Sequence, residues 1–498
     1  MTVINPNSIS GITSITLPSG DGNVLTIHTN DGTERFRIDS SGNVKVGSAC
    51  TISQDGDVFF TGVCTATTLT GAASGLTGAL PAIDGSALTG MASTENVRTG
   101  ILDVAGISTF RNTMNVGAAV TISESGIEAS GIGITCASIN GTQIGGRRNI
   151  IINGAMEVAQ RGTSSTSTGY QTIDRVRHYH NGTDEAPTYA QVDVASGTSP
   201  YTNGFRKAFK ITNGNQTSGA GVNDSVEFVY FVEAQDLAKC GWNYTSSSSF
   251  VTLSFWIKSS VAQNFYGHLT TQDGTQQNYP YETGSLTADT WTKIVRTIPG
   301  NSNLQFDNDV NRGLSIKIVG FRGTTYTGSG SALNTWAAYA SGSRMPDNTS
   351  TWYTTNDATL EITGLQLEVG SQATAFEHRS FGEELSLCQR YYYLLASGAT
   401  KFMCMGDFWI DAQADGGIVL PVEMRTTPTL EHTNGADYYR VWTNGTNSHI
   451  DGAVNLWNRS HNKAVTWYAT PDANRTAGHS CRWITNNAST HFAFSAEL

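Results

Sequence analysis

Charged residues are scarce in this sequence. Of its 498 residues 30 are basic and 41 acidic, so charged side chains make up 14% of the chain, against about 25% in ordinary globular proteins. This excludes a disordered chain that is kept extended by its charge. The net charge is −11 and no basic stripe is present, which argues against nucleic acid as a partner because phosphate binding needs clustered Lys and Arg.

Long hydrophobic runs, a leader sequence and paired-cysteine motifs are also missing. No stretch approaches the roughly 18 consecutive apolar residues of a membrane span, so no membrane insertion is expected. Residues 1–10 have neither a basic region nor an apolar run, which predicts no signal or transit peptide. The seven cysteines contain no Cys-x-x-Cys pair and are typical of reduced, mostly buried thiols in a protein made in a cytosol.

The first part of the chain, 1–146, is poor in aromatic residues and repetitive. Asp21–Ile27, Ser41–Val46 and Asp55–Phe60 each place a turn pair before a short alternating strand, the pattern of a hairpin unit. Val46–Ser53 returns about 70 residues later as Val116–Ser123. We therefore predict an extended, repetitive β shaft over 1–146.

Strands this short, with few large side chains, cannot bury enough apolar area alone, because an isolated hairpin is marginally stable. Other copies of the same chain are the simplest cover, since small residues allow close backbone approach. The shaft therefore predicts a homotrimer. A flexible Gly/Ser linker is the alternative, and the regular alternation of Val and Ile argues against it.

After Gly146 the strand patterns lengthen and Trp and Tyr appear. In Val251–Lys258 the apolar residues fall on one face with a period of two, as in a half-buried strand. Many short strands without alternating helices indicate an antiparallel β-sandwich, which we place at 147–379. The strongest strand patterns are Phe205–Ile211, Val226–Val232, Val251–Lys258, Trp291–Ile298, Leu314–Ile318 and Leu360–Val369.

The residues after the sandwich change pattern twice. Ser380 and Glu383 have the spacing of a helix capping box, and apolar residues follow at intervals of three and four up to Leu395. We predict a connecting helix over 380–395, which either packs on one domain or contributes to a threefold contact. Residues 396–498 are rich in Trp, Asn, Gly and Ser with strand signals, and predict a C-terminal β tip domain. The whole chain is thus predicted to be all-β apart from this helix.

Enzyme motifs are absent: the sequence has no G-x-S-x-G, G-x-G-x-x-G, phosphate-binding P-loop or H-E-x-x-H. We therefore expect no enzyme and no cofactor. A glycan depolymerase stays as an alternative, because it needs only two carboxylates about 5 to 9.5 Å apart. The carboxylates considered are Glu227, Glu233, Asp407, Asp411 and Asp415.

Two short patterns contain metal-ligand residue types. His178 and His180 share one face of a possible strand, but no third ligand is apparent. Asp307, Asp309 and Asn311 offer oxygen ligands without the Gly and distal Glu of an EF-hand, so a turn capped by its own side chains is preferred. We expect no metal site.

Several segments resemble a known family. Asn149–Arg161, Phe255–Ser260, Trp291–Gly300 and Leu365–Gly370 resemble, in order and spacing, the jelly-roll, carbohydrate-binding-module-like domain of phage tail fibre proteins. Phe376–Tyr392 is similar to the segment that follows this domain in those proteins. The resemblance marks core and turn positions and supplies no sugar-binding residues.

The two ends of the chain extend the resemblance. Gly417–Thr429 and His491–Leu498 resemble the terminal β domain beyond that helix, and Val97–Thr109 resembles shafts of marine cyanophage structural proteins. The middle and terminal resemblances together cover about seven-tenths of the chain, and residues 437–487 depart from them.

The resemblance implies a tail fibre of the virion that forms homotrimers and touches the host cell. We expect it to mediate host recognition and adhesion by binding surface polysaccharide or lipopolysaccharide. The N-terminal end is remote from the tip and is therefore expected to attach to phage tail or adaptor proteins, with assembly in the host cytoplasm. The alternatives are a glycan-depolymerising tailspike and a purely structural virion protein.

A sugar site pairs a flat aromatic ring, which meets the C–H face of the sugar, with side chains that bond its hydroxyls. Two groups of residues meet that demand, and core packing is the alternative role for each aromatic. Trp256 and Trp291 are assigned to the core. The preferred candidates lie in the tip, in the part that departs from the family: Tyr438, Tyr439, Trp442, His449, Trp457 and His461. The second group lies in the sandwich: Trp336, Tyr339, Trp352 and Tyr353.

Overall fold

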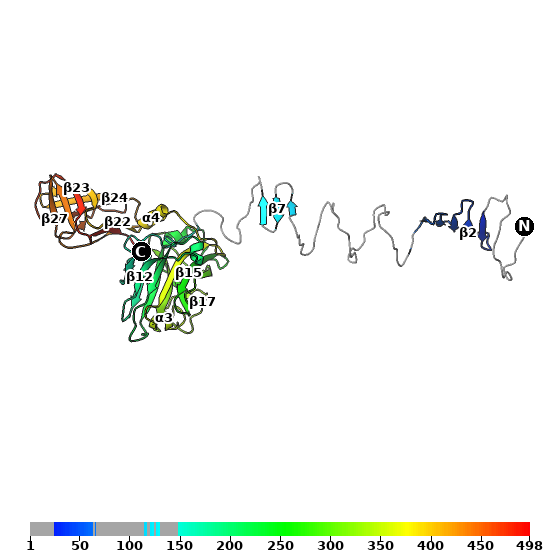
Figure 1. Ribbon diagram of the computed structural model, residues 1–498, viewed down its shortest axis with the longest axis horizontal. Coiled ribbons are helices and arrows are strands. Elements are labelled where there is room, and N and C mark those ends of the chain that lie inside the picture. The colour runs from blue at the N-terminus through cyan, green and yellow to red at the C-terminus, as the bar shows by residue number, and fades with distance from the viewer. Residues whose placement is uncertain (1–23, 63–64, 66–113, 117–119, 124–125, 130–147) are drawn as a thin grey trace. The chain divides into compact units, whose positions relative to one another are not determined.

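The computed structural model describes residues 24–62, 65, 114–116, 120–123, 126–129 and 148–498. The fold is all-β, as predicted, with strands in antiparallel sheets and only short helices in the described ranges (Figure 1). The chain divides into two compact units, Met1–Arg111 and Asn112–Leu498. Within the described ranges, no helix has the length and hydrophobicity needed to cross a membrane.

The described strands of the first unit form a five-stranded antiparallel meander. The predicted units at Ser41–Val46 and Asp55–Phe60 are confirmed, because Gly42 and Gly56 take the positive φ of a tight turn just before a strand. Asp21–Ile27 begins outside the described residues. The strands are β1 (Leu25–His28), β2 (Glu34–Ile38), β3 (Val44–Val46), β4 (Cys50–Ile52) and β5 (Val58–Phe60).

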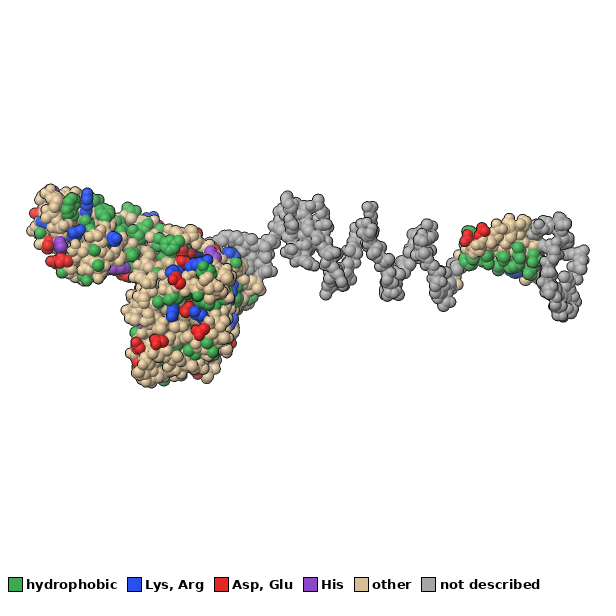
Figure 2. All heavy atoms as spheres, in the orientation of Figure 1, with side chains coloured by type: hydrophobic (Ala, Val, Ile, Leu, Met, Phe, Trp, Pro, Cys, Tyr) green, Lys and Arg blue, Asp and Glu red, His purple; other side chains and the backbone are tan. Residues whose placement is uncertain are grey.

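This meander has no core of its own. No residue between positions 24 and 62 is buried, and Phe59 is 60% exposed. Apolar side chains gather along one side of the strands (Figure 2). A sheet with no second layer and no buried side chain lacks the burial that stabilises a fold.

The sequence repeat is also a repeat of strand pairing. β3 pairs with β4 through Val44–Ile52 and Val46–Cys50. Seventy positions later, Met114–Ile122 and Val116–Val120 form the same pairs between β6 (Met114–Val116) and β7 (Val120–Ser123), and β8 (Gly126–Ala129) follows. The repeat therefore preserves the register of the hairpin.

The middle part is a two-layer β-sandwich, as predicted, with one sheet of seven strands and one of six. The first sheet, in spatial order, contains β10 (Gly169–Tyr170), β11 (Val176–Asn181), β14 (Ser225–Glu233), β19 (Arg312–Arg322), β16 (Asn264–Thr271), β17 (Gln277–Ser285) and β20 (Ala337–Ala338). The second contains β18 (Thr292–Pro299), β15 (Phe250–Ser259), β21 (Thr359–Val369), β13 (Lys207–Thr212), β12 (Thr188–Asp193) and β9 (Ser164–Ser165). Three helical turns join strands: α1 (Ser199–Thr202), α2 (Ala234–Ala238) and α3 (Thr351–Thr354).

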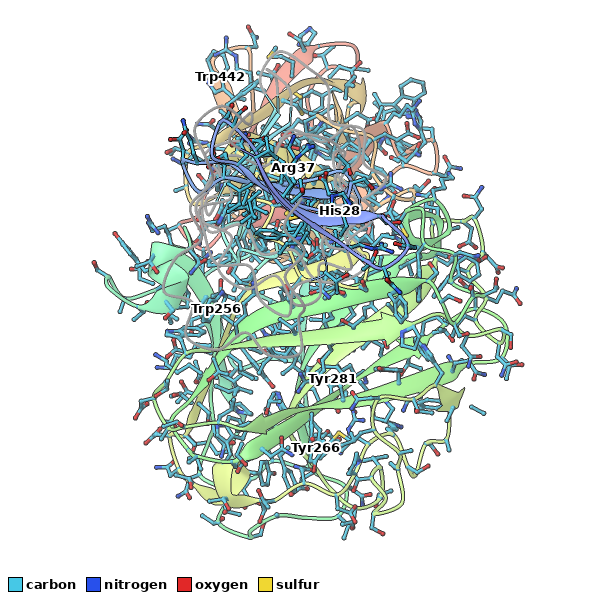
Figure 3. The ribbon with its side chains drawn as sticks, turned by 90° about the vertical axis from the view of Figure 1, so that its right-hand side faces the viewer. His28, Arg37, Trp256, Tyr266, Tyr281 and Trp442 are labelled. Carbon is cyan, nitrogen blue, oxygen red and sulfur yellow. The ribbon has the colours of Figure 1, made fainter. Side chains whose placement is uncertain are left out.

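The core lies between these two sheets. The predicted inward residues of β15, from Val251 to Ile257 at every second position, have no exposed surface. Tyr281 of β17 meets them from the other sheet (Figure 3). Trp256 points to the opposite face and, with Trp291, packs half-buried around Phe205, a packing role as assigned.

The predicted helix is real but shorter than 380–395. α4 spans Phe381–Gln389, and its N-cap Ser380 accepts a hydrogen bond from the backbone N–H of Glu383 as the capping box predicts. The residues up to Leu395 belong instead to a strand, β22 (Tyr392–Ser397). The buried carboxylate of Glu233 holds Arg390 and Tyr391 just before it, and aromatic residues favour strands.

Helix α4 packs on the sandwich and on the end of the chain. Its buried Cys388 lies in a small cluster with Val229 and Phe231 of β14 and with Leu498. This is the arrangement expected of a bridge packed on one domain.

The tip domain contains a seven-stranded sheet and a three-stranded sheet. The larger sheet, in spatial order, is β27 (Thr446–Ile450), β26 (Tyr439–Thr443), β30 (Ser480–Thr485), β23 (Phe402–Ile410), β24 (Gln413–Val419), β29 (Ala464–Ala469) and β28 (Asn455–Leu456). The smaller one is β22, β31 (His491–Ser495) and β25 (Thr429–His432). Trp467 and Trp483, both fully buried, form the centre of its core with Phe492.

Described cysteines are free thiols, as expected for reduced residues. Cys388, Cys404 and Cys481 are buried. Burial raises the pKa of Cys404 and of Cys481 to about 12, so neither thiol is a reactive nucleophile near neutral pH. Cys64 and Cys136 lie outside the described residues.

Candidate functional site

The large sheet of the tip domain has one face in the core and one face toward solvent. On β26, Tyr439 points inward, is 1% exposed and donates from its hydroxyl to the His491 carbonyl. Trp442, three positions further along the same strand, lies on the outer face, where Figure 3 shows it at the surface of the tip. Alternation along the strand therefore separates two candidates: Trp442 stays accessible and Tyr439 is a core residue.

The remaining polar candidates of this region do not converge on one point. Tyr438 packs half-buried against the tip core. His449 contacts the carboxylate of Asp437 through Nδ1. His461 is exposed and accepts a hydrogen bond from the backbone N–H of Lys463 over 3.2 Å.

A row of outward side chains crosses the middle of this sheet. Trp442 of β26 lies opposite Arg482 of β30, which lies opposite Met405 of β23. The Arg482 guanidinium sits 4.9 Å from the centre of the Trp442 ring, a cation–π contact. Met405, at the end of this row, also lines a groove.

The groove lies over β23, β24 and β29 and has a volume of about 560 Å³. That size falls in the usual range of small-ligand sites, about 300 to 1,000 Å³. It is lined by Met405, Gly406, Asp407, Trp409, Asp415, Gly416, Gly417, Arg459 and Thr466.

Asp415 organises the polar side of this groove. One carboxylate oxygen accepts a hydrogen bond from Gln413 over 2.7 Å. The other accepts from Trp457 Nε1 over 2.8 Å and from Arg459 Nη2 over 3.0 Å. Arg459 also lies 4.6 Å from the centre of the Trp457 ring. The candidate Trp457 is thus fixed beside the groove by a carboxylate that was not among the predicted glycan-binding residues.

Trp409 supplies the flat apolar surface that the polar side lacks. The pairing of β23 with β24 is irregular between Phe408 and Ile410, and Trp409 is the extra residue of this bulge. Phe408 is buried in the core, whereas Trp409 is 63% exposed. Strand alternation next to the buried Phe408 places the Trp409 ring on the outer face, beside the outward Asp407.

A glycine keeps the groove open. A Cβ atom on Gly417 would lie 2.8 Å from Cγ2 of Thr466, closer than real Cβ contacts allow. Asp407, directly across from Asp415 in the β23–β24 pair, is exposed, and its carboxylate makes no hydrogen bond or ion pair within the described residues. Sequence reasoning had named Asp407 and Asp415 only as possible hydrolytic carboxylates.

The sandwich candidates are placed differently. Trp352 and Tyr353 have no exposed surface, and Trp336 is also buried. Trp336 Nε1 donates to the Pro299 carbonyl over 2.7 Å, and Trp352 Nε1 donates to the Thr359 carbonyl over 3.0 Å. Tyr339 is half-buried beside Arg344. Three of these four aromatics therefore take the packing role.

The other carboxylates considered for hydrolysis have structural partners. Burial alone would raise the pKa of Glu227, but Arg322 and Lys317 outweigh it and hold that pKa below its usual range. Burial would likewise raise the pKa of Glu233, but hydrogen bonds from Arg390 and Tyr391 outweigh burial and lower that pKa. A general acid needs a raised pKa, so neither carboxyl is suited to donate a proton to a leaving group. Asp411, exposed in the β23–β24 turn, accepts from the Ala477 N–H over 2.8 Å.

The two metal-like patterns are also occupied by local contacts. His178 stacks on Tyr189, and Thr172 bonds its Nε2 over 2.8 Å, while His180 lies by the Tyr189 hydroxyl. Asp309 accepts from the backbone and side-chain nitrogens of Asn311, as a self-capped turn does. Among the described residues no group of three or more His, Cys, Asp or Glu is placed to hold a metal ion.

A larger hollow of about 730 Å³ lies between the sandwich edge near Tyr170 and strand β25 of the tip. Its central guanidinium, Arg161, pairs with Glu497 over 3.1 Å and with Glu431 over 3.6 Å. Arg161 also lies 3.4 Å from the centre of the Tyr392 ring. These charged groups pair with one another and hold the tip to the sandwich, so they are not available to a ligand. The tip groove is therefore the better candidate site.

No protein-family model matches the chain, and no curated protein matches its sequence. Solved structures match parts of it. A family 11 carbohydrate-binding module from Clostridium thermocellum, in complex with a mixed-linked tetrasaccharide, matches with a TM-score of 0.20 and 13% identity over 43% of this chain and 98% of that chain.

Two further structures are similar at the same level. The N-terminal cellulose-binding domain of β-1,4-glucanase C from Cellulomonas fimi gives a TM-score of 0.21 and 11% identity over 44% of this chain and 99% of that chain. A tandem CBM22 domain of Xyn10C from Paenibacillus barcinonensis gives 0.23 and 6% over 73% of this chain and 100% of that chain. At such low TM-scores these likenesses say nothing of what this chain binds.

Proposed function

We propose that this protein is a phage tail-fibre adhesin that binds host surface glycan through the outer face of its tip domain. The observation that carries the proposal is the convergence in one groove of the exposed Trp409 ring, the outward Asp407 carboxylate, and Arg459 anchored by Asp415. A sugar needs this combination, because its C–H face packs on a ring while its hydroxyls need acceptors and donors. Trp442 and Arg482 extend the face for a longer glycan.

The proposal includes a homotrimer held through the N-terminal part. The support is the meander β1–β5, which has no buried residue and exposes Ile27, Phe59 and Phe60. Further copies of the same repeated hairpins would bury these side chains. Attachment to the phage tail through the N-terminal end, and assembly in the host cytoplasm, complete the proposal.

Binding of host surface polysaccharide to the purified full-length protein tests the adhesin. We expect the Trp409→Ala variant to lose at least about tenfold in affinity, since one buried aromatic contact contributes on the order of 1 to 3 kcal/mol. Val419→Ala is the matched control, because Val419 is exposed on the neighbouring strand β24 and does not line the groove. Equal loss in both variants, or in neither, contradicts the assignment to the groove.

Two further outcomes separate the alternatives. Shortened polysaccharide after incubation would replace the adhesin by a depolymerase. Soluble protein is expected to block adsorption of the phage. A protein that binds no glycan and blocks no adsorption would be a structural component of the virion.

A further inference from the structure

The charge of the tip groove points to the class of sugar that it accepts. We propose that the groove takes an uncharged sugar, one that presents hydroxyl groups, and rejects sugars carrying carboxylate, sulfate or phosphate groups. This inference rests on the proposed glycan-binding function and deepens it.

The first step is the count of charges that face the groove. Asp407 and Asp415 are the acidic residues of its lining, and Arg459 is the basic one. Arg459 is already committed: Nη2 donates to Asp415 over 3.0 Å and Nε donates to Thr466 Oγ1 over 3.3 Å. One negative charge, that of Asp407, is therefore left without a counter-ion in the lining.

The second step is where that charge lies. Asp407 stands two residues before Trp409 on β23 and directly opposite Asp415 on β24. Side chains directly opposite on one face of an antiparallel pair lie close together, with Cβ atoms about 4.5 to 5.5 Å apart. A sugar ring resting on Trp409 therefore has Asp407 along its edge.

The third step is the hydrogen-bonding chemistry. An ionised carboxylate only accepts hydrogen bonds, so Asp407 pairs with a hydroxyl, which donates. An anionic substituent has no proton to donate and meets a like charge, which acts against the wrong ligand. The groove thus combines an attractive element for hydroxyls with a repulsive one for anions.

Arg482 is the cation that an acidic sugar would need to reach. It lies on the same sheet face but outside the lining, stacked on Trp442 and opposite Met405. Its guanidinium is held over Trp442 of β26, on the side of β30 away from β23, and it forms no ion pair with Asp407 within the described residues.

The experiment compares matched ligands on the full-length protein. A panel of neutral hexose and N-acetylhexosamine oligosaccharides is measured beside the same oligosaccharides with primary hydroxyls oxidised to carboxylates. We expect a neutral member to bind and its oxidised partner to bind at least about tenfold more weakly. Asp407→Asn should reduce that discrimination severalfold, whereas Asp451→Asn, the same change at an exposed loop residue outside the lining, should leave it unchanged.

The outcomes distinguish this inference from the function on which it rests. Oxidised sugars that bind the unaltered protein as tightly as neutral ones overturn the inference and leave the adhesin standing. Discrimination that survives Asp407→Asn overturns the role given to Asp407. Absence of binding to every member, by a protein shown to be folded by circular dichroism, overturns both.

Discussion

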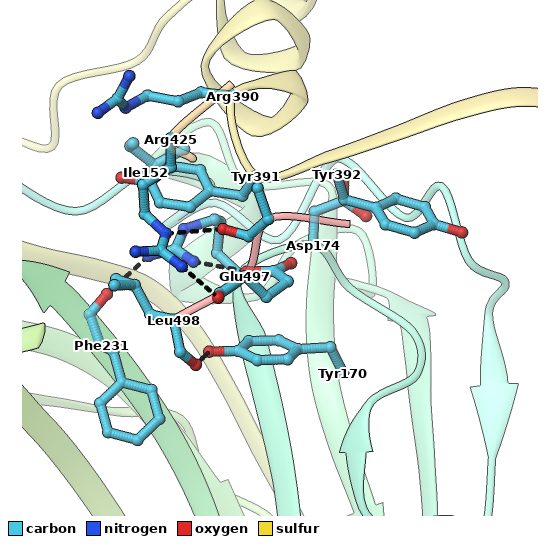
Figure 4. A network of polar contacts seen from close by, with 12 residues as sticks. Ile152, Tyr170, Asp174, Phe231, Arg390, Tyr391, Tyr392, Arg425, Glu497 and Leu498 are labelled. Atoms are coloured by element: carbon cyan, nitrogen blue, oxygen red, sulfur yellow. Dashed lines mark hydrogen bonds and ion pairs between the residues drawn. The ribbon is translucent and has the colours of Figure 1, made fainter. Parts of the chain in front are cut away.

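Arg175 donates a hydrogen bond from Nη1 to the carboxylate of Glu497 over 2.7 Å, and the two side chains are 1% and 6% exposed. Glu497 belongs to a network of polar contacts beside Tyr391 and Leu498 (Figure 4). Arg175 also donates to the Phe231 carbonyl over 2.7 Å and lies 3.5 Å from the centre of the Tyr391 ring. A second guanidinium, Arg161, holds the other carboxylate oxygen. The last residues of the chain are thus fixed into the sandwich, although they follow the final strand of the tip.

The first prediction concerns this buried ion pair. Glu497→Ala leaves the buried Arg175 without its carboxylate and Arg161 with only the longer contact to Glu431. Losing one partner of a buried ion pair costs about 3 to 5 kcal/mol. We expect urea unfolding to show a loss of this order. Asp193→Ala is the control, since Asp193 pairs with Lys207 at the surface and such pairs contribute about 0 to 1 kcal/mol. Equal stability of the Glu497→Ala variant and the parent would show that the ion pair does not hold the chain end.

The second prediction is a pH dependence that comes from His178. Burial lowers the pKa of His178 from 6.5 to about 3, and His180 and Arg161 add repulsion. Below pH 6.5 the unfolded chain therefore binds a proton at this residue, whereas the folded protein does not. The free energy of unfolding falls for this reason as the pH drops from 6.5 toward 3. The contribution is about 1.4 kcal/mol per pH unit.

His178→Phe isolates this contribution, because the ring that stacks on Tyr189 is kept and the titration is removed. We expect the free energy of unfolding of the parent to fall more steeply than that of the variant between pH 6.5 and 5. Parallel curves would be incompatible with a buried, neutral His178.

The third prediction tests the assembly of the N-terminal part. Ile52→Asp places a charge on β4 of the meander, where a neighbouring chain is expected to cover it, and should cost several kcal/mol of assembly free energy. Sedimentation should then show a trimer for the parent and smaller species for the variant. Val222→Asp, at an exposed residue of the sandwich, should leave the trimer unchanged.

Truncation gives an independent check on the same prediction. A protein that starts at Arg147 should trimerise more weakly than the full chain. A stable, soluble monomer of residues 1–146 would refute the homotrimer.

The fourth prediction concerns avidity. Trp442→Ala or Trp457→Ala should weaken the binding of isolated trimers to host cells more than the binding of whole phage. Several weak sites on one particle raise avidity by roughly 10²- to 10⁴-fold, which masks the loss of one contact. Adsorption of phage and binding of labelled trimer, measured on the same cells, give the comparison. Equal losses in both measurements would argue against multivalent attachment.

Much of the fold followed from periodicity. The alternation in Val251–Lys258 predicted β15, and the capping-box spacing from Ser380 predicted the start of α4. The predicted end of that helix was wrong, because the spacing of apolar residues up to Leu395 is compatible with a helix although Tyr392–Ser397 form a strand. Only the carboxylate of Glu233, far away in the sequence, holds Arg390 and Tyr391 at the start of a strand.

The sequence by itself determined the inward-facing pattern of β15, the hairpin turns at Gly42 and Gly56 and the start of α4, since these depend on residue types and local spacing. Tertiary structure decided which aromatics are free. Trp352 is enclosed by the sandwich, Tyr439 points into the tip core, and Trp409 lies on the outer face next to the buried Phe408. The physical reason is that exposure depends on which face a strand presents and on what packs against it, and long-range pairing fixes both.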